Sequence, residues 1–381
     1  MFGDVDMDVK KIIIIVVAVV LIIALAASSV VINFNRLAAI EKEAEESSAA
    51  EESAAEGTDE PLQEEFEYTV DGSDAVITAY KGTGGMVLIP YNVGQNGEYD
   101  VTAIADDAFR GNTEITDIII VDTVTSIGSG AFADCTGLES IEIDGECTVG
   151  DGAFSGCTAV TSIDIRGNIG TISKDMFSDC TQLDTLSVEG GTAIEDNAFG
   201  GFKKLTDLTL DGAGSIGKNA FEGCTSLGII YVYGIDTLSE GMFKNCDALN
   251  ILILDDVKTI EKEAFEGCIG LSEIDVPDGV TDINERAFAN CTGISYAYLP
   301  DSVKYISADA FDGCTELSEI TVSGENKTYC DIDGVLYSKD GEQIIITPLA
   351  YVPEEDYEEE TDEEETDDDD SNVDDSEEGV G

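Results

Sequence analysis

The sequence predicts a strand-rich α/β-type repeat solenoid, and three observations lead to this prediction. A phenylalanine recurs every 22 or 23 residues, aliphatic residues stand at fixed distances on both sides of it, and a short alternating apolar run follows it. A fixed period of this length is typical of a solenoid, in which each copy buries its apolar side against its neighbours. The ten phenylalanines are Phe109, Phe132, Phe154, Phe177, Phe199, Phe221, Phe243, Phe265, Phe288 and Phe311.

The apolar columns around the phenylalanine predict one strand in each coil. Five places before it and six places after it, every copy has Ile, Leu or Val, and the residue directly before it is Ala or Met. Further aliphatic residues follow at nine and eleven places, as in Leu138, Ile141 and Ile143. The end of this run alternates with the period of a half-buried strand, so we expect each coil to add a strand to a parallel sheet.

A turn should follow each phenylalanine. Two places after it only Gly, Asp or Asn occurs, as at Gly111, Asp134 and Asn245. These residue types tolerate a left-handed backbone conformation. We therefore expect the Ala-Phe segment to be a single helical turn closed by a left-handed residue, and this turn is the α part of the predicted fold.

Eight of the ten cysteines stand three places after the phenylalanine, and Asn112 and Phe202 replace the cysteine in the first and fifth copies. A metal or redox array would lose a ligand at Phe202, whereas an interior column tolerates it. Stacked cysteines about 4.8 Å apart lie within disulfide range, but their parallel Cβ directions oppose bridging. We expect a buried ladder of free thiols, with scattered disulfides or metal and redox work as alternatives. Cys147 should fill an aliphatic position, and Cys330 should belong to a C-terminal cap.

The repeated pattern L-x-x-I-x-I, followed by V-x-x-I-x-x-x-A-F-x-G-C, resembles the BspA-type leucine-rich repeats of bacterial and some protist surface proteins. The resemblance covers all ten copies and implies a leucine-rich-repeat superhelix over residues 66–353. It also implies hairpins at residues 66–82 and 329–348, which would cover the apolar faces of the terminal coils. Such a protein is expected to act in adhesion or in recognition of a partner.

Composition argues against several classes of function. The chain has 81 acidic and 18 basic residues, a net charge of -63, and no histidine or tryptophan. Nucleic acid and anionic lipid surfaces would be repelled, because both are bound through clustered Lys and Arg. A Ser/His/Asp triad, a Cys/His pair and a histidine-bound zinc are excluded. We therefore expect no enzymatic activity, and assign no catalytic residue, cofactor or metal.

The two ends of the chain differ from its centre. Residues 12–34 carry no charge and are long enough to cross a bilayer as one helix, after a short cytoplasmic segment at 1–11. This signal anchor would make a single-pass cell-membrane protein with the repeats outside the cytoplasm; cleavage after Ala24-Leu25-Ala26 would instead release a secreted protein. An Ala/Glu/Ser-rich stalk is expected at 35–65. A disordered acidic tail is expected at 354–381, where residues 354–378 hold 18 acids.

The outward positions of the predicted strands include one apolar and aromatic group. Tyrosine gives a rigid amphipathic surface for an extracellular protein or glycan, although aromatic and β-branched residues also simply suit strands. Two functions stay open: a recognition module, and a structural spacer without a specific ligand. The sequence sets no oligomeric state. The candidate ligand-binding residues are Ile229, Tyr231, Tyr233, Ile251, Ile253, Tyr296 and Tyr298.

Overall fold

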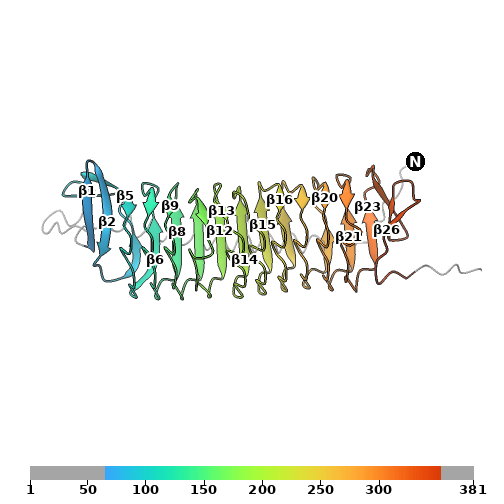
Figure 1. Cartoon of the computed structure of the whole chain (residues 1–381), viewed down its shortest axis with the longest axis horizontal. Helices are drawn as coiled ribbons and strands as arrows, with labels where there is room; N and C mark the ends of the chain where they lie inside the picture. The colour runs from blue at the N-terminus through green and yellow to red at the C-terminus, as the bar shows by residue number, and fades with distance from the viewer. Residues whose placement is uncertain (1–64, 353–381) are drawn as a thin grey trace, which may run out of the picture. The chain divides into compact units, whose positions relative to one another are not determined.

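The computed structural model describes residues 65–352, and its strands lie side by side in chain order (Figure 1). One strand from each coil enters what we call the main sheet, whose neighbours are parallel and in register. Its first eight strands are β3 (Gly85–Leu88), β6 (Ile115–Ile120), β8 (Ser140–Asp144), β10 (Ser162–Arg166), β12 (Thr185–Glu189), β14 (Asp207–Asp211), β15 (Ile229–Tyr233) and β17 (Ile251–Leu254). The sheet is interrupted there and continues with β19 (Glu273–Asp275), β21 (Tyr296–Leu299) and β23 (Glu319–Val322).

A second set of strands runs along the same coils and was not predicted. Most of these strands have two residues, and they place the aliphatic residue that stands five places before the phenylalanine. We call this interrupted set the second sheet. Its strands are β5 (Tyr99–Ile104), β7 (Ser126–Ile127), β9 (Thr148–Val149), β11 (Thr171–Ile172), β13 (Ala193–Ile194), β16 (Thr237–Leu238), β18 (Thr259–Ile260), β20 (Asp282–Ile283) and β22 (Tyr305–Ile306).

Antiparallel strands flank the repeats in the described part of the chain. Strands β1 (Phe66–Asp71) and β2 (Asp74–Tyr80) form a hairpin, and β4 (Asn92–Val93) pairs with β5. At the other end, β24 (Tyr329–Ile332), β25 (Val335–Ser338) and β26 (Ile344–Ile346) pair antiparallel. Because β2 and β3 pair in parallel with β5 and β6, the solenoid has about 11 turns, one more than the phenylalanine copies.

A stack of phenylalanine rings fills the interior. The ten rings are at most 4% exposed, and neighbouring ring centroids lie 4.6 to 6.2 Å apart. Burying each ring contributes about 1.5–3 kcal/mol of transfer free energy. Phe66 and Tyr80 of the first hairpin contact Phe109 at 6.4 and 5.5 Å, so the aromatic stack continues into β1 and β2.

The helical turn predicted around each phenylalanine was wrong, and with it the α part of the fold class. Every secondary-structure element within residues 66–352 is a strand. The residue two places after the phenylalanine is left-handed in all ten copies, with φ between 59° and 78°, as expected. The residue two places before it is also left-handed in eight copies, including Glu263 and Arg286. Left-handed residues on both sides leave no run of right-handed residues for a helix, so the segment is a series of tight turns.

Several predicted segments lie outside the described residues. They are the cytoplasmic segment 1–11, the membrane helix 12–34, nearly all of the stalk 35–65 and the acidic tail 354–381. Among residues 65–352, we find no helix with the length and hydropathy needed to span a bilayer.

Candidate binding face

The main sheet has one side against the phenylalanine stack and one side turned away from it, which we call the open face. On β15, Ile230 and Val232 point inward and are fully buried, whereas Ile229, Tyr231 and Tyr233 alternate with them and are half-buried. Pairing in register puts Ile251 beside Ile229 and Ile253 beside Tyr231. These five outward residues are therefore one contiguous surface, which we call the tyrosine–isoleucine patch.

Two of the seven candidate residues lie apart from this patch. Tyr296 and Tyr298 are half-buried on β21, and β19 lies between β17 and β21 in the order of the coils. The residues of β19 paired with them are Glu273 and Asp275. The tyrosine pair on β21 is held in place, since the Tyr296 hydroxyl lies 2.5 Å from the Thr321 hydroxyl. The single area expected from the sequence is thus two groups with an acidic strand between them.

The main sheet is open between β17 and β19. Between other coils a backbone hydrogen bond joins the residues just before neighbouring main-sheet strands, as from Ser295 N to Ser272 O at 2.9 Å. In the described chain no such bond joins Ser272 N to Asn250 O. Leu252 and Leu254 are half-buried, whereas the corresponding inward residues of β15 are 0% exposed. Nothing in the sequence pattern signals this opening, because the aliphatic columns continue unchanged through it.

Acidic side chains are the most frequent type at the remaining outward positions of the open face. Glu142, Asp164 and Asp275 alternate with buried residues of their strands and point outward. Within the strands of the main sheet, Arg166 is the single basic residue. The acids of these strands are Asp117, Glu142, Asp144, Asp164, Glu189, Asp207, Asp211, Glu273, Asp275 and Glu319.

Arg166 shows how this face holds a cation. Its guanidinium donates to Glu142 Oε1 at 2.5 Å and to Asp164 Oδ2 at 2.7 Å, and lies 3.4 Å from Asp144 Oδ1. Burial raises the pKa of Glu142, Arg166 lowers it, and the charges of Asp144 and Asp164 raise it further. The three carboxylates repel one another, so they gain from sharing one guanidinium.

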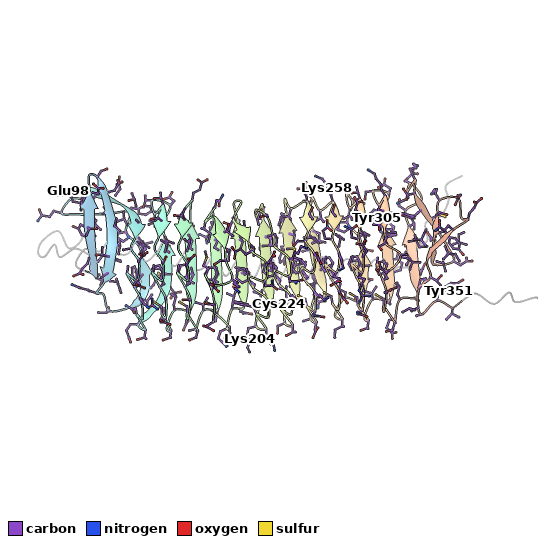
Figure 2. All side chains as sticks on the ribbon, in the orientation of Figure 1. Glu98, Lys204, Cys224, Lys258, Tyr305 and Tyr351 are labelled. Atoms are coloured by element: carbon purple, nitrogen blue, oxygen red, sulfur yellow. The ribbon has the colours of Figure 1, made fainter. Side chains whose placement is uncertain are left out.

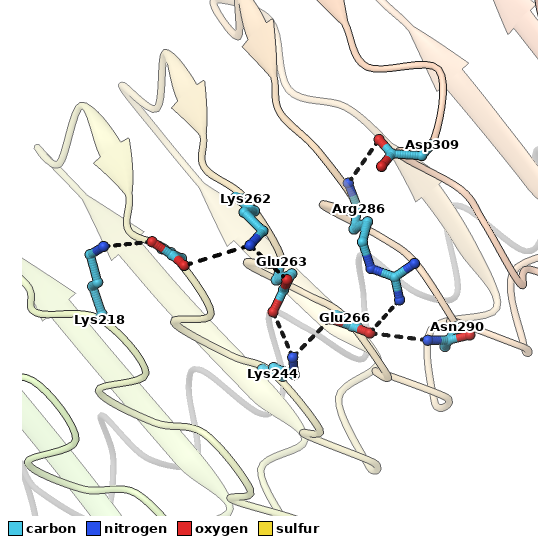
Figure 3. Close-up of polar contacts among 9 residues, drawn as sticks. Lys218, Lys244, Lys262, Glu263, Glu266, Arg286, Asn290 and Asp309 are labelled. Carbon is cyan, nitrogen blue, oxygen red and sulfur yellow. Dashed lines mark hydrogen bonds and ion pairs between the residues drawn. The ribbon is translucent and has the colours of Figure 1, made fainter.

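Most other bases lie on the turns rather than on the open face. Lys204 and Lys258 lie at opposite long edges of the view in Figure 2. Around the later phenylalanine turns, bases and acids alternate from coil to coil in what we call the charge chain (Figure 3). Its members are Lys218, Glu240, Lys262, Glu263, Lys244, Glu266 and Arg286.

The described structure confirms free cysteines and gives each repeat cysteine a specific contact. All ten thiols are free, nine are buried, and Cys330 is half-buried. In all eight repeat positions, Sγ lies 3.0 to 3.6 Å from the carbonyl oxygen of the phenylalanine one coil earlier. Burial raises the pKa of Cys224 to about 12, so its reactive thiolate is disfavoured at neutral pH.

Two further features lie away from the open face. A shallow hollow of about 450 Å³ on the second sheet is lined by Thr171, Glu195, Asp196 and Ser215, among others, and Asp196 there accepts the backbone N–H of Lys218 at 2.7 Å. In residues 65–352 no three metal-binding side chains come close enough to share an ion.

Coils of about 22 residues, two sheets of parallel strands and a central aromatic stack define a leucine-rich-repeat type of solenoid. The sequence profile described as "BspA type Leucine rich repeat region" matches residues 102–232 and 236–333 in 6 copies. This is more than half of the 381 residues, and the chain belongs to the BspA-type leucine-rich repeat family.

Solved structures of bacterial proteins are also similar to this chain. A leucine rich cell surface protein from Faecalibacterium prausnitzii A2-165 is 25% identical, over 71% of this chain and 96% of that chain, with a TM-score of 0.32. A leucine-rich repeat protein from Bacteroides ovatus is 23% identical over 69% and 94%, with a TM-score of 0.35. The T. pallidum Leucine Rich Repeat protein is 22% identical over 58% and 92%, with a TM-score of 0.36. No curated protein matches the chain.

Proposed function

We propose that this protein is a membrane-anchored cell-surface recognition module that binds a protein or glycan on the open face of its main sheet. Leucine-rich-repeat domains generally serve interactions with other proteins, and solenoids offer extended surfaces for this. The observation that carries the proposal is the tyrosine–isoleucine patch. On β15 the two tyrosines alternate with fully buried residues, which fixes their direction, and all five side chains of the patch stay partly exposed.

The proposal also assigns roles to segments outside the open face, namely an anchor, a stalk and two caps. Residues 12–34 would be the anchor, residues 35–65 would hold the repeats away from the bilayer, and the repeats would lie outside the cytoplasm. The hairpin β1–β2 and the strands β24–β26 would be caps. Their aromatic residues support this role: Phe66 and Tyr80 contact Phe109, and the Tyr329 hydroxyl accepts the N–H of Ile306 at 3.2 Å.

A matched pair of tyrosine variants tests the face. The full chain in mild detergent would be screened against glycan and protein arrays, together with Tyr231→Ala/Tyr298→Ala and Tyr91→Ala/Tyr305→Ala. The control tyrosines are 54% and 43% exposed and lie outside the main sheet. We expect ligands of the parent to be lost from the first variant and kept by the second. Equal binding by all three chains would contradict the proposed face.

A structural spacer is the second candidate. The ring stack and the inter-coil hydrogen bonds favour stiffness, and ten coils at roughly 4.8 Å each would extend about 48 Å. A parent chain that binds nothing on either array would favour the spacer.

The anchor has its own test. Mass spectrometry of the mature chain isolated from membranes should find the original N-terminus, because an uncleaved anchor keeps residues 1–34. A mature chain that begins at Ala27 would contradict the single-pass anchor and would indicate a secreted protein.

A further inference from the structure

We infer that the partner bound by the open face is a basic polypeptide segment that carries an apolar side chain between its Lys or Arg residues. This inference rests on the proposed function and specifies its ligand class. The open face already binds one basic side chain of its own. Arg166, the one base in the main-sheet strands, contacts three carboxylates of β8 and β10. A guanidinium from another chain would find further carboxylates on the later strands of the same face.

Carboxylates without an ion pair border both tyrosine groups. Pairing in register puts Asp211 beside Tyr233, Asp275 beside Tyr298, and Glu319 beside Tyr296. All three acids are exposed, and none of the salt bridges within residues 65–352 includes them. A basic side chain here gains a carboxylate and a tyrosine ring together, whereas an acidic partner would be repelled.

Neighbouring carboxylates also shift the pKa values of two of these tyrosines. Burial raises the pKa of Tyr231, and the neighbouring charge of Asp207 raises it further. The pKa of Tyr296 is likewise raised by burial, and then by Asp275 and Glu319 after an opposing effect from Thr321. A bound cation would offset the negative electrostatic potential around these tyrosines, whereas a bound anion would add to it.

The centre of the face suits an apolar side chain. Ile251 and Ile253 point outward on β17, and the sheet opening beside them leaves Leu252 and Leu254 half-buried. An aliphatic side chain placed there would shield the partly exposed surface of Leu252 and Leu254, at about 25 cal/mol for each Å² removed from water.

The order of the strands sets a spacing for the partner. Asp211, Asp275 and Glu319 stand twelve, ten and eight places after the phenylalanines of their coils, so they lie on a diagonal across β14, β19 and β23. With coils about 4.8 Å apart and a shift of two residues, about 7 Å, along the strand at each step, the separations are at least about 16 Å and then about 12 Å. An extended chain rises about 3.3 Å per residue and turns alternate side chains to one side, so basic side chains four residues apart match both distances on one face. The matching segment is Arg-Ser-Leu-Ser-Arg-Ser-Ser-Ser-Arg, whose leucine faces the same way as the arginines and falls over the tyrosine–isoleucine patch. We call this the spaced probe, and its rearrangement Leu-Ser-Ser-Arg-Arg-Arg-Ser-Ser-Ser the clustered probe.

Binding of the two labelled probes to the full chain in detergent tests the inference. The face variant is Asp211→Asn/Asp275→Asn/Glu319→Gln. The control variant, Glu98→Gln/Asp151→Asn/Glu285→Gln, removes three exposed acids outside the main sheet. Attraction to the acidic residues 354–378 is common to all three chains and to both probes, so it appears as a shared background.

We expect the parent to bind the spaced probe more tightly than the clustered probe, and the face variant to lose roughly tenfold in affinity for the spaced probe. The control variant should stay within about twofold of the parent. Equal binding of the spaced probe by the face variant and the parent, or equal binding of the two probes by the parent, would overturn the inference.

The tyrosine variants separate this inference from the proposed function. If Tyr231→Ala/Tyr298→Ala loses an array ligand that the face variant still binds, the open face is a binding site but its partner is not basic. If neither variant changes any array ligand, the proposed function itself fails.

Discussion

Cysteine suits its column because it is small, apolar and a weak hydrogen-bond donor. The carbonyl oxygen of Phe199 accepts the N–H of Phe202 at 3.3 Å from its own coil and the Cys224 thiol at 3.3 Å from the next. Each coil is thereby joined to its neighbour inside the wall without a covalent bond. Phe202 fits the same column by packing edge-on against Phe199, with centroids 5.4 Å apart. The tolerance inferred from the sequence thus has a packing explanation.

Thiol counting tests the cysteine ladder. Nine thiols are buried, so the folded chain should react at no more than one position, Cys330, with a polar maleimide. The chain unfolded in denaturant without a reductant should titrate ten thiols, because none is in a disulfide. Rapid labelling of several thiols in the folded state would contradict the buried ladder, and fewer than ten after unfolding would indicate disulfides.

Asn326 links the last coil to β24. It is 0% exposed, its amide donates to Pro300 O at 2.8 Å and Val303 O at 3.1 Å, and its Oδ1 accepts two backbone N–H groups. The motif Asn326-Lys327-Thr328 fits a glycosylation site in sequence. In the folded protein, the side-chain amide of Asn326 is used in these hydrogen bonds.

Substitution of Asn326 should loosen that end of the molecule. Asn326→Ala leaves buried backbone groups without partners, so we expect a loss of about 2–4 kcal/mol and faster amide exchange across residues 326–338. Asn96→Ala, at an exposed loop position, should change stability by less than about 0.5 kcal/mol. Unchanged exchange at residues 326–338 in the Asn326 variant would show that the hairpin does not depend on it.

At the scale of elements, the sequence predicts strands that alternate and misses those that do not. The main-sheet strands have up to six residues with an inward and an outward series, and on β15 and β21 the candidate residues alternate with buried ones. The two-residue strands of the second sheet give no such periodicity. The α turn was wrong because Asp107, Asn197 and Glu263 are left-handed, and residues of these types also occur in helices.

The charge chain holds the turns of neighbouring coils together. Lys244 Nζ lies 2.6 Å from Glu263 Oε2 and 2.9 Å from Glu266 Oε2, and Arg286 Nη2 lies 2.6 Å from Glu266 Oε1. Glu263 has φ of 59°, a left-handed conformation that glycine, asparagine and aspartate tolerate better than glutamate does. Glycine stands at this position in other copies, as at Gly130 and Gly241. We attribute the glutamate to its ion pairs with lysine.

The charge chain predicts a pH dependence. Hydrogen bonding to Lys244, with further help from Lys262, lowers the pKa of Glu263 to about 2, although burial acts the other way. A carboxylate whose pKa is lower in the folded state stabilises above its ordinary pKa near 4.5, and this stabilisation is lost as pH falls toward about 2. The stability difference between the parent and Glu263→Gln should therefore be largest above pH 4.5 and shrink below it. Denaturant titrations at several pH values measure it.

A control separates the ion pair from general acid effects. Glu98→Gln changes an exposed carboxylate away from the charge chain and should give a difference that stays small at every pH. A Glu263→Gln difference that is constant from neutral pH to about pH 2 would contradict the ion-pair explanation.

Across the whole described solenoid, the contacts between coils are uneven. The phenylalanine stack continues from coil seven to coil eight, with Phe243 and Phe265 5.5 Å apart, and the second sheet joins β16, β18 and β20. The main sheet alone is interrupted there. The aliphatic repeat positions predict which residues point to the interior. They are the same whether or not neighbouring main-sheet strands are hydrogen-bonded to each other. The opening depends on the relative placement of two coils, which no single repeat encodes.

Amide exchange should therefore locate the weakest contact of the main sheet. The N–H of Gly228 is bonded to Thr206 O at 2.9 Å, whereas the corresponding N–H of Ser272 has no such bond to Asn250. We expect amides in residues 272–276 to exchange faster than those in residues 228–232, because opening costs less free energy where no ladder has to break. Mass spectrometry of exchanged peptides measures both segments in one sample. Equal protection of the two would mean that β17 and β19 are paired in solution, and the apolar centre assigned to the open face would then be closed.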